Sequence, residues 1–142
     1  MAMALVIVAA LAAIGVPRYL RSLDRYRLDA AARRVELDLA LARERATAQS
    51  APVSITFSVD PAPSEYTMSG LDDPDRPGTP YVVRLHEDPY HATITSASFG
   101  GDGTLSFNGY AIPDDGGQLI VAVGSAQRII TVASATSLDP ID

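Results

Sequence analysis

The sequence predicts an α+β protein in which a long N-terminal helix packs against an antiparallel β-sheet head. The first observation is a spacing of apolar residues that suits a helix and continues to Gln49. The second is a change at Val53, after which apolar and polar residues alternate over about six to eight short strands. The roughly 90 residues after the helix are enough for one modest core. A single head domain is therefore expected.

We expect three parts along the chain. Residues 1–17 form the transmembrane part of the N-terminal helix, residues 18–50 form the amphipathic part of the same helix, and residues 51–142 form the β-rich head. Pro17 marks the junction, and because proline removes a backbone donor and crowds the preceding turn, a kink is expected there.

The run from Met1 to Val16 has no charged side chain, so it favours lipid or a packed helical bundle over water. Sixteen helical residues span about 24 Å, which is short of the roughly 30 Å of a bilayer core. We therefore expect the true start of the protein to lie upstream of Met1. The expected membrane and assembly residues are Leu5, Val6, Ile7, Val8, Leu11, Ile14, Val16 and Pro17.

The pattern after Pro17 is amphipathic. Apolar residues recur at helical spacing, and most charged residues fall elsewhere, so one face should be buried. The stripe comprises Leu28, Val35, Leu39, Ala42 and Ala46, flanked by Ala31, Ala32, Leu37 and Leu41. Asp29 and Arg33 have the spacing of a favourable helical ion pair. Pro52 predicts that the helix ends near Gln49 to Ala51.

Short strands separated by turn signals are predicted for the head. Gly70 to Pro80 is rich in Gly, Pro and Asp, so a surface loop is expected there. The expected strands are 53–59, 66–68, 81–85, 92–99, 104–107, 119–123 and 128–133, with the last two forming a hairpin.

Charge is distributed unevenly along the chain. Residues 18–50 carry eight Arg and five acids, whereas residues 51–142 carry three Arg and twelve acids. A head this acidic repels phosphate backbones, so nucleic-acid binding is disfavoured. The chain has no Cys, which excludes disulfides and thiolate metal sites.

Two groups of side chains are weak metal candidates. Asp72, Asp73 and Asp75 share one loop and could bind calcium, but they lack the ordered acid spacing of an EF-hand, and a solvated acidic loop is favoured. His86 and His91 flank a short acidic segment, but their spacing fits no familiar zinc pattern. The sequence contains no nucleophile elbow and no Walker loop, so we expect neither enzymatic activity nor a cofactor.

The arginines of residues 18–34 have two interpretations. A solvated helix face near lipid headgroups is favoured, because acids lie among them. The alternative is that they pair with acidic groups on neighbouring subunits.

Three stretches resemble a known family. The segments 12–20 (AAIGVPRYL), 31–43 (AARRVELDLALAR) and 53–57 (VSITF) are similar to the end of the transmembrane helix, the following helix and the first strand of type IV pilin-like proteins. The subgroup that they resemble is the GspH/FimT-type minor pseudopilins of type II secretion and type IV pilus systems.

This resemblance implies a structural subunit that lies in the inner membrane before assembly and then packs against other pilins or pseudopilins in a filament. It also implies a prepilin peptidase that cleaves a basic leader, followed by N-terminal methylation. No such leader precedes Met1 in this sequence. We expect the DNA upstream to encode, in frame, a segment like Gly-Phe-Thr-Leu-x-Glu.

The orientation in the membrane depends on which signal is used. Arg18, Arg21, Arg25 and Arg27 follow the apolar run, and the positive-inside rule alone would leave the head in the cytoplasm. The resemblance implies an extracytoplasmic head on a single-pass anchor, and we adopt that orientation because we expect the true N-terminus to lie upstream of Met1.

The leading hypothesis is therefore a membrane-anchored pseudopilin or minor pilin that assembles through its N-terminal helix. One alternative is a DNA-uptake minor pilin of the FimT type, although residues 134–142 contain two Asp and no basic residue. A less favoured alternative is a membrane-anchored enzyme domain that binds a metal.

Overall fold

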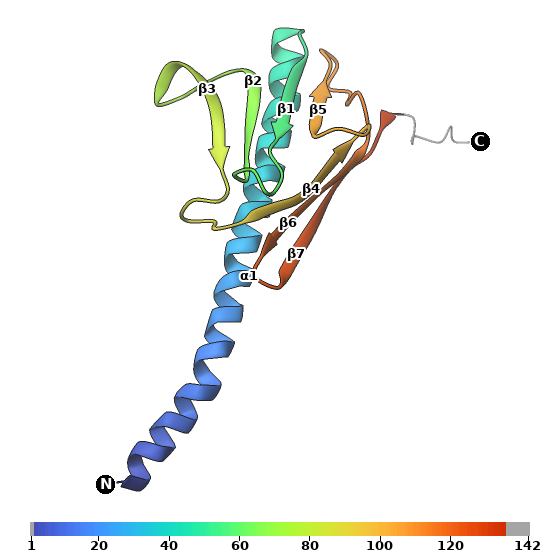
Figure 1. The fold of residues 1–142 in the computed structure, drawn as a ribbon. Coiled ribbons are helices and arrows are strands. Elements are labelled where there is room, and N and C mark those ends of the chain that lie inside the picture. The colour runs from blue at the N-terminus through green and yellow to red at the C-terminus, as the bar shows by residue number, and fades with distance from the viewer. Residues whose placement is uncertain (1, 136–142) are drawn as a thin grey trace, which may run out of the picture.

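The computed structural model describes residues 2–135, which form one helix and seven strands (Figure 1). The predicted α+β class is confirmed. In chain order the elements are α1 (Ala2–Gln49), β1 (Val53–Phe57), β2 (Glu65–Asp73), β3 (Arg76–Arg84), β4 (Thr93–Phe99), β5 (Thr104–Phe107), β6 (Gly117–Val123) and β7 (Ala126–Val132).

Helix α1 is continuous through Pro17. Its axis curves, so that the part projecting beyond the head is tilted relative to the part beside the strands (Figure 1). The helix ends where expected, because Ser50 adopts a left-handed conformation with φ of 47°. The N–H of Ala51 donates to the carbonyl of Ala46 and that of Ser50 to the carbonyl of Thr47, which is the Schellman arrangement.

The strands form two antiparallel sheets, whereas one sheet was expected. The first has the order β3-β2-β1-β5 and the second has the order β4-β6-β7. Both sheets contact α1, which touches β1 and β5 of the first sheet and β6 and β7 of the second. The buried stripe of α1 from Leu28 to Ala46 is about 27 Å long, which gives both sheets room on one helix.

The prediction of a loop at residues 70–80 is wrong. These residues form most of a hairpin in which β2 and β3 pair from Glu65 with Arg84 to Asp73 with Arg76. A register shift follows Met68, and Gly70 there has φ of 72°, so the strand continues past its turn-forming residues through a bulge. Pro77 and Pro80 are tolerated because β3 lies at the edge of its sheet.

The core lies between α1 and the two sheets. The predicted stripe is confirmed for Leu28, Ala31, Ala32, Val35, Leu39, Ala42 and Ala46, all of which are buried. Leu37 is 68% exposed, so its predicted place beside the stripe is wrong. Its position on the helix turns it away from the sheets, while Asp38 is buried in the stripe.

Candidate membrane and assembly surface

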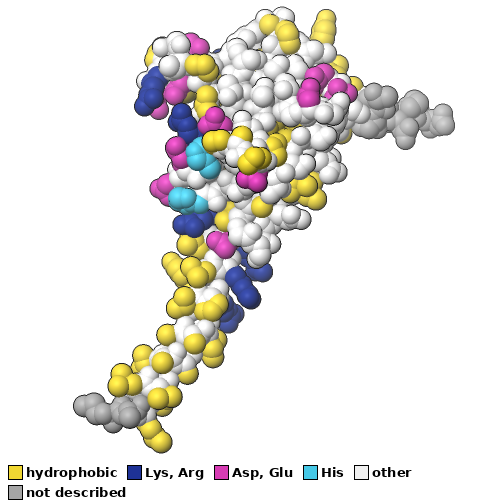
Figure 2. Space-filling model, viewed as in Figure 1, with side chains coloured by type: hydrophobic (Ala, Val, Ile, Leu, Met, Phe, Trp, Pro, Cys, Tyr) yellow, Lys and Arg dark blue, Asp and Glu magenta, His cyan; other side chains and the backbone are white. Residues whose placement is uncertain are grey.

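The N-terminal part of α1 projects from the head and carries apolar side chains all round. Figure 2 shows these side chains covering the projecting helix. The predicted membrane and assembly residues are all exposed on it, at 71% for Leu5, 68% for Val6, 61% for Ile7, 64% for Val8, 67% for Leu11, 73% for Ile14 and 56% for Val16. Pro17 is also exposed within the helix. No packing within residues 2–135 accounts for the exposure of these side chains.

Among the described residues, α1 is the one helix long and apolar enough to cross a membrane. The apolar part of this helix is not buried against the rest of the described residues. A helix that is apolar on every side satisfies its backbone internally and leaves only apolar side chains facing outward. Such a surface suits lipid or the packed helices of other subunits.

Arginine side chains gather where α1 meets the head (Figure 2). Arg18, Arg21 and Arg25 are exposed on this part of α1. Asp29 pairs with Arg128 of β7 at 2.8 Å and not with Arg33, so the expected helical ion pair is wrong. The acid instead joins α1 to the second sheet.

A groove of about 500 Å³ runs along α1 beside the turn that follows β3. Two exposed apolar side chains of the helix, Tyr26 and Leu37, lie in it together with Arg33. The groove is lined by Tyr26, Asp29, Ala30, Arg33, Arg34, Leu37, Pro89 and Tyr90. The surface of α1 beside the head therefore combines exposed apolar side chains with charged ones.

A buried polar cluster joins α1 to the hairpin of β2 and β3. The Tyr66 hydroxyl donates to Asp38 Oδ2 at 2.5 Å, and the Tyr81 hydroxyl donates to Asp38 Oδ1 at 3.1 Å. Arg34 Nε donates to Asp38 Oδ2 at 3.2 Å, and a second Arg34 nitrogen donates to the Tyr81 hydroxyl. Asp38 is 5% exposed, so its charge is paired and bonded rather than solvated.

The cluster shifts the pKa values of three of its members. Burial raises the pKa of Tyr66, and its hydrogen bond to Asp38 raises it further. Burial, followed by the charge of Asp38, also raises the pKa of Tyr81. Burial opposes the charge of Arg34, but the attraction of Asp38 and the tyrosine hydroxyls outweighs it and raises the pKa of Arg34. Arg34 therefore stays charged, and both tyrosines stay protonated, at neutral pH.

These shifts predict a loss of stability in alkali. The pKa of Tyr66 is raised in the folded state, so as the pH rises above about 10 the unfolded chain loses this proton first. The contribution of Tyr66 to the stability of the folded state is therefore complete below about pH 10 and decreases above it. We expect the urea midpoint of the full chain in detergent to fall more steeply with rising alkaline pH than that of Tyr66→Phe. Parallel slopes for the two proteins would contradict this role of Tyr66.

The acidic candidates Asp72, Asp73 and Asp75 lie at the tip of the β2–β3 hairpin. Asp72 Oδ2 accepts a hydrogen bond from the Gly78 N–H at 3.2 Å, and Asp73 Oδ1 accepts one from the Asp75 N–H at 2.9 Å. Two of the three carboxylates thus bind the backbone of their own turn. Within residues 2–135, no group of three or more His, Cys, Asp and Glu side chains is placed to hold a metal ion.

The two histidines lie in the turn between β3 and β4, and each lies beside a different acid. His86 Nδ1 is 3.2 Å from the carbonyl oxygen of Ser64, and its Nε2 is 3.8 Å from Glu87. His91 Nε2 is 3.3 Å from Asp88 Oδ1. The histidines therefore take part in separate local contacts.

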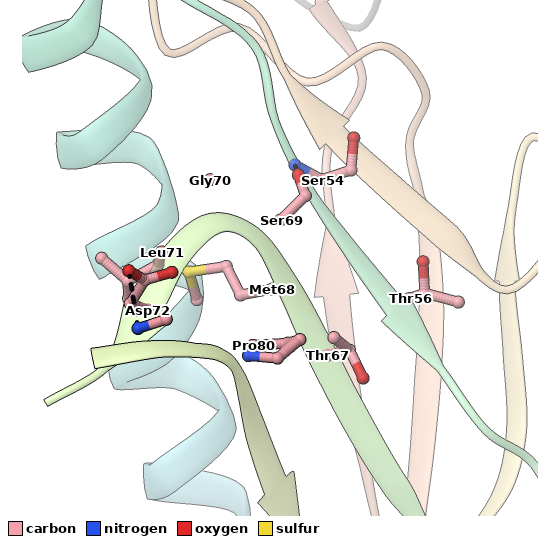
Figure 3. A pocket seen from close by; sticks show the side chains of 10 residues that line it. Ser54, Thr56, Thr67, Met68, Ser69, Gly70, Leu71, Asp72 and Pro80 are labelled. Carbon is pink, nitrogen blue, oxygen red and sulfur yellow. Dashed lines mark hydrogen bonds between the residues drawn. The ribbon is translucent and has the colours of Figure 1, made fainter. Parts of the chain in front are cut away.

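An open hollow of about 330 Å³ lies on the first sheet and is lined by residues of β1, β2 and β3 (Figure 3). Its polar lining comes mainly from hydroxyl groups, and Ser69 Oγ accepts a hydrogen bond from the Ser54 N–H at 2.9 Å. It is lined by Ser54, Thr56, Thr67, Met68, Ser69, Gly70, Leu71, Asp72, Gly78 and Pro80. Neither histidine lines this hollow, so it does not pair a serine with an imidazole base.

Asp38 is the residue that sequence reasoning missed. A signal existed, because Asp38 is three residues after Val35 and four before Ala42, both on the predicted stripe. Its spacing therefore placed it on the buried face. Its two tyrosine partners come from strands whose register with α1 the sequence does not specify.

Comparison with known proteins gives one match. A family model described as type II transport protein GspH matches residues 31–136, which is more than half of the chain. The matched part includes strands β1 to β7 and most of the helical segment packed against them. No curated protein and no solved structure matches the chain.

Proposed function

The chain belongs to the GspH family of type II transport proteins, and we propose that it is a membrane-anchored structural subunit of a pseudopilus. The observation that supports this proposal is the projecting apolar segment of α1, exposed on all sides and joined directly to a folded head. Residues 1–17 would lie in the inner membrane as a single pass before assembly. The head, residues 51–142, would lie outside the cytoplasm on the amphipathic part, residues 18–50.

The mechanism is the transfer of a helix from lipid to a helical bundle. Between Leu5 and Val16 the helix offers apolar side chains. Its backbone groups bond within the helix, except for the carbonyl of Ala13, because its partner position is Pro17, which has no N–H. Moving this segment from lipid into contact with similar helices exposes no polar side chain, so packing can favour assembly. Other pseudopilins are the partners, and a prepilin peptidase would act on a precursor that carries a leader.

A charge in the apolar segment tests this proposal. We expect Ala9→Asp in the full chain to reduce co-purification with partner pseudopilins about tenfold or more, because an aspartate at the centre of a span costs roughly 2.5 to 3.5 kcal/mol. Ala9 is exposed on the projecting helix. The measurement is recovery of partner pseudopilins from detergent-solubilised host cells that contain the whole set.

The matched control is Ala40→Asp, because Ala40 is also an exposed alanine of α1 but lies beside the head. We expect it to co-purify with partners normally. Both variants should retain a folded head, measured as resistance of the β strands to protease. Normal assembly of Ala9→Asp would refute the proposal.

The alternative functions have less support. GspH is a structural family rather than an enzyme family, so a catalytic role has no support from the match. A basic head surface would support a DNA-uptake role. The head contains only Arg76, Arg84 and Arg128 as basic residues, and Arg84 and Arg128 pair with Glu65 and Asp29. The C-terminal residues 136–142, on which part of that alternative depends, lie outside the described residues.

A further inference from the structure

Strand β7 ends the second sheet, and its outer side has no neighbouring strand among residues 2–135. It follows β6 through a two-residue turn, Gly124-Ser125, in which Gly124 has φ of 59°. In a two-residue hairpin the residues that flank the turn form a hydrogen-bonded pair, and bonded and non-bonded pairs then alternate. The N–H and C=O groups of Gln127, Ile129 and Thr131 therefore point away from β6.

The other three sheet edges are less open than that of β7. Two of them, β5 and β4, form hydrogen bonds with neighbouring loops. On the outer side of β5, the Asp114 N–H donates to the Ser106 carbonyl, and Asp114 Oδ1 accepts from the Ser106 N–H. On the outer side of β4, the Ile94 carbonyl accepts from the Asp60 N–H, and the Ile94 N–H donates to Ser64 Oγ.

The edge strand β3 is protected by its composition. It contains Pro77 and Pro80, which lack N–H donors, and it begins with the exposed Arg76. Proline and charge are common means of preventing another strand from adding to an edge.

By contrast, β7 has neither proline nor an unpaired charge. Its sequence AQRIITV is rich in β-branched residues, and Arg128, its one charged residue, is paired with Asp29. Ile129 is 53% exposed. It lies on the same face of the strand as Gln127 and Thr131, which are also exposed. The edge thus combines free backbone groups with an apolar side chain, which are the features that bind an extended peptide.

The position of this edge favours a neighbour in the same membrane. The β6–β7 turn points toward the projecting part of α1 (Figure 1). It also contacts α1, since a Cβ on Gly124 would lie 2.6 Å from the Asp24 carboxylate. The edge therefore begins at the part of the head closest to the apolar segment, where adjacent anchored subunits would lie.

A second copy of this chain fits the edge poorly. Antiparallel pairing of two β7 strands requires a two-fold axis perpendicular to the sheet. Because α1 packs on this sheet, that rotation would point the two helices in opposite directions, and both could not enter one membrane from the same side.

We propose that the β7 edge binds an extended strand from the head of a different, neighbouring pseudopilin, with an apolar side chain opposite Ile129. This inference rests on the proposed function, because the partner is held beside this chain by its own membrane helix. Backbone hydrogen bonds from Gln127, Ile129 and Thr131 would supply the pairing. The alternating side chains would then select the partner.

Photo-cross-linking of the full chain in host cells with the complete set of pseudopilins tests the proposal. A benzoyl-phenylalanine replaces Ile129, Thr79 of β3 or Ile7 of the apolar segment in separate proteins. We expect a cross-link to another pseudopilin from positions 129 and 7, and about tenfold less from position 79, because the prolines protect that edge.

A pair of variants at Thr131 tests the backbone contribution. Thr131→Pro removes an outward N–H while leaving the bonds to β6, so we expect about a tenfold lower cross-link yield from position 129. Thr131→Val keeps the N–H and should stay within about twofold of the unchanged chain. Unfolding of the purified proteins in detergent checks that both fold. If the proline variant does not fold, the proposal is decided by the cross-link from position 129 in the protein that keeps Thr131.

The outcomes separate the two proposals. A cross-link from position 7 with none from position 129 would overturn the edge proposal and leave the assembly proposal standing. Absence of both cross-links would overturn the assembly proposal as well. A cross-link from position 129 mainly to a second copy of this chain would overturn the assigned partner, as would an equal yield from position 79.

Discussion

Replacing Asp38 by alanine is expected to lower the free energy of unfolding of the head by about 3 kcal/mol. The substitution removes the carboxylate that accepts from Tyr66, Tyr81 and Arg34, and it leaves these donors partly buried without that partner. Buried donors without acceptors lose the hydrogen bonds that water gives them in the unfolded chain. Urea unfolding of the full chain in detergent, followed by tyrosine fluorescence, measures the change.

Asp29→Ala is the matched control for this prediction. Asp29 also pairs with an arginine and also lies on α1, but its side chain is about half exposed. An exposed pair of this kind contributes about 0 to 1 kcal/mol, so the control should change stability by no more than that. Equal effects of the two substitutions would show that the buried cluster is not a significant source of stability.

Leu39→Ala is expected to destabilise the head by about 2 to 4 kcal/mol, whereas Leu37→Ala should change its stability by less than about 0.5 kcal/mol. The two leucines lie two residues apart on α1 and undergo the same chemical change. Leu39 is 7% exposed in the core, whereas Leu37 is 68% exposed. Only Leu39→Ala should therefore leave a cavity between the helix and the sheets.

The urea midpoints of the two leucine variants measure this difference directly. Because both lose the same side chain from the same helix, a change in helix propensity cancels in the comparison. A Leu37→Ala variant that is as unstable as Leu39→Ala would mean that the packing of α1 differs from the one described.

Periodicity was sufficient to predict the helix and most strands. The buried stripe from Leu28 to Ala46 repeats at 3.6 residues, and β1 alternates between buried and exposed residues as its sequence does. These patterns are local, so one chain segment contains the whole signal. The projecting apolar segment was equally evident, because a run without charge needs no partner to be recognised.

Features that depend on distant residues were not predicted. The split into two sheets depends on which strands pair, and residues 70–80 became strand because the hairpin continues through a bulge at Gly70. The cluster at Asp38 likewise needs Tyr66 from β2 and Tyr81 from β3. Turn residues and charges indicate local preference, whereas pairing across the fold determines where those residues lie.

The order of the strands has a consequence for how the head unfolds. Strand β4 belongs to the second sheet, yet it precedes β5, which completes the first sheet. The chain thus crosses between the sheets before either is finished, and both are held by one helix. Neither sheet is a contiguous piece of sequence that could remain folded while the other melts, so the head should unfold in a single cooperative transition. A chain cut between β4 and β5 would lose both sheets together, and a damaged subunit would be open to proteolysis as a whole.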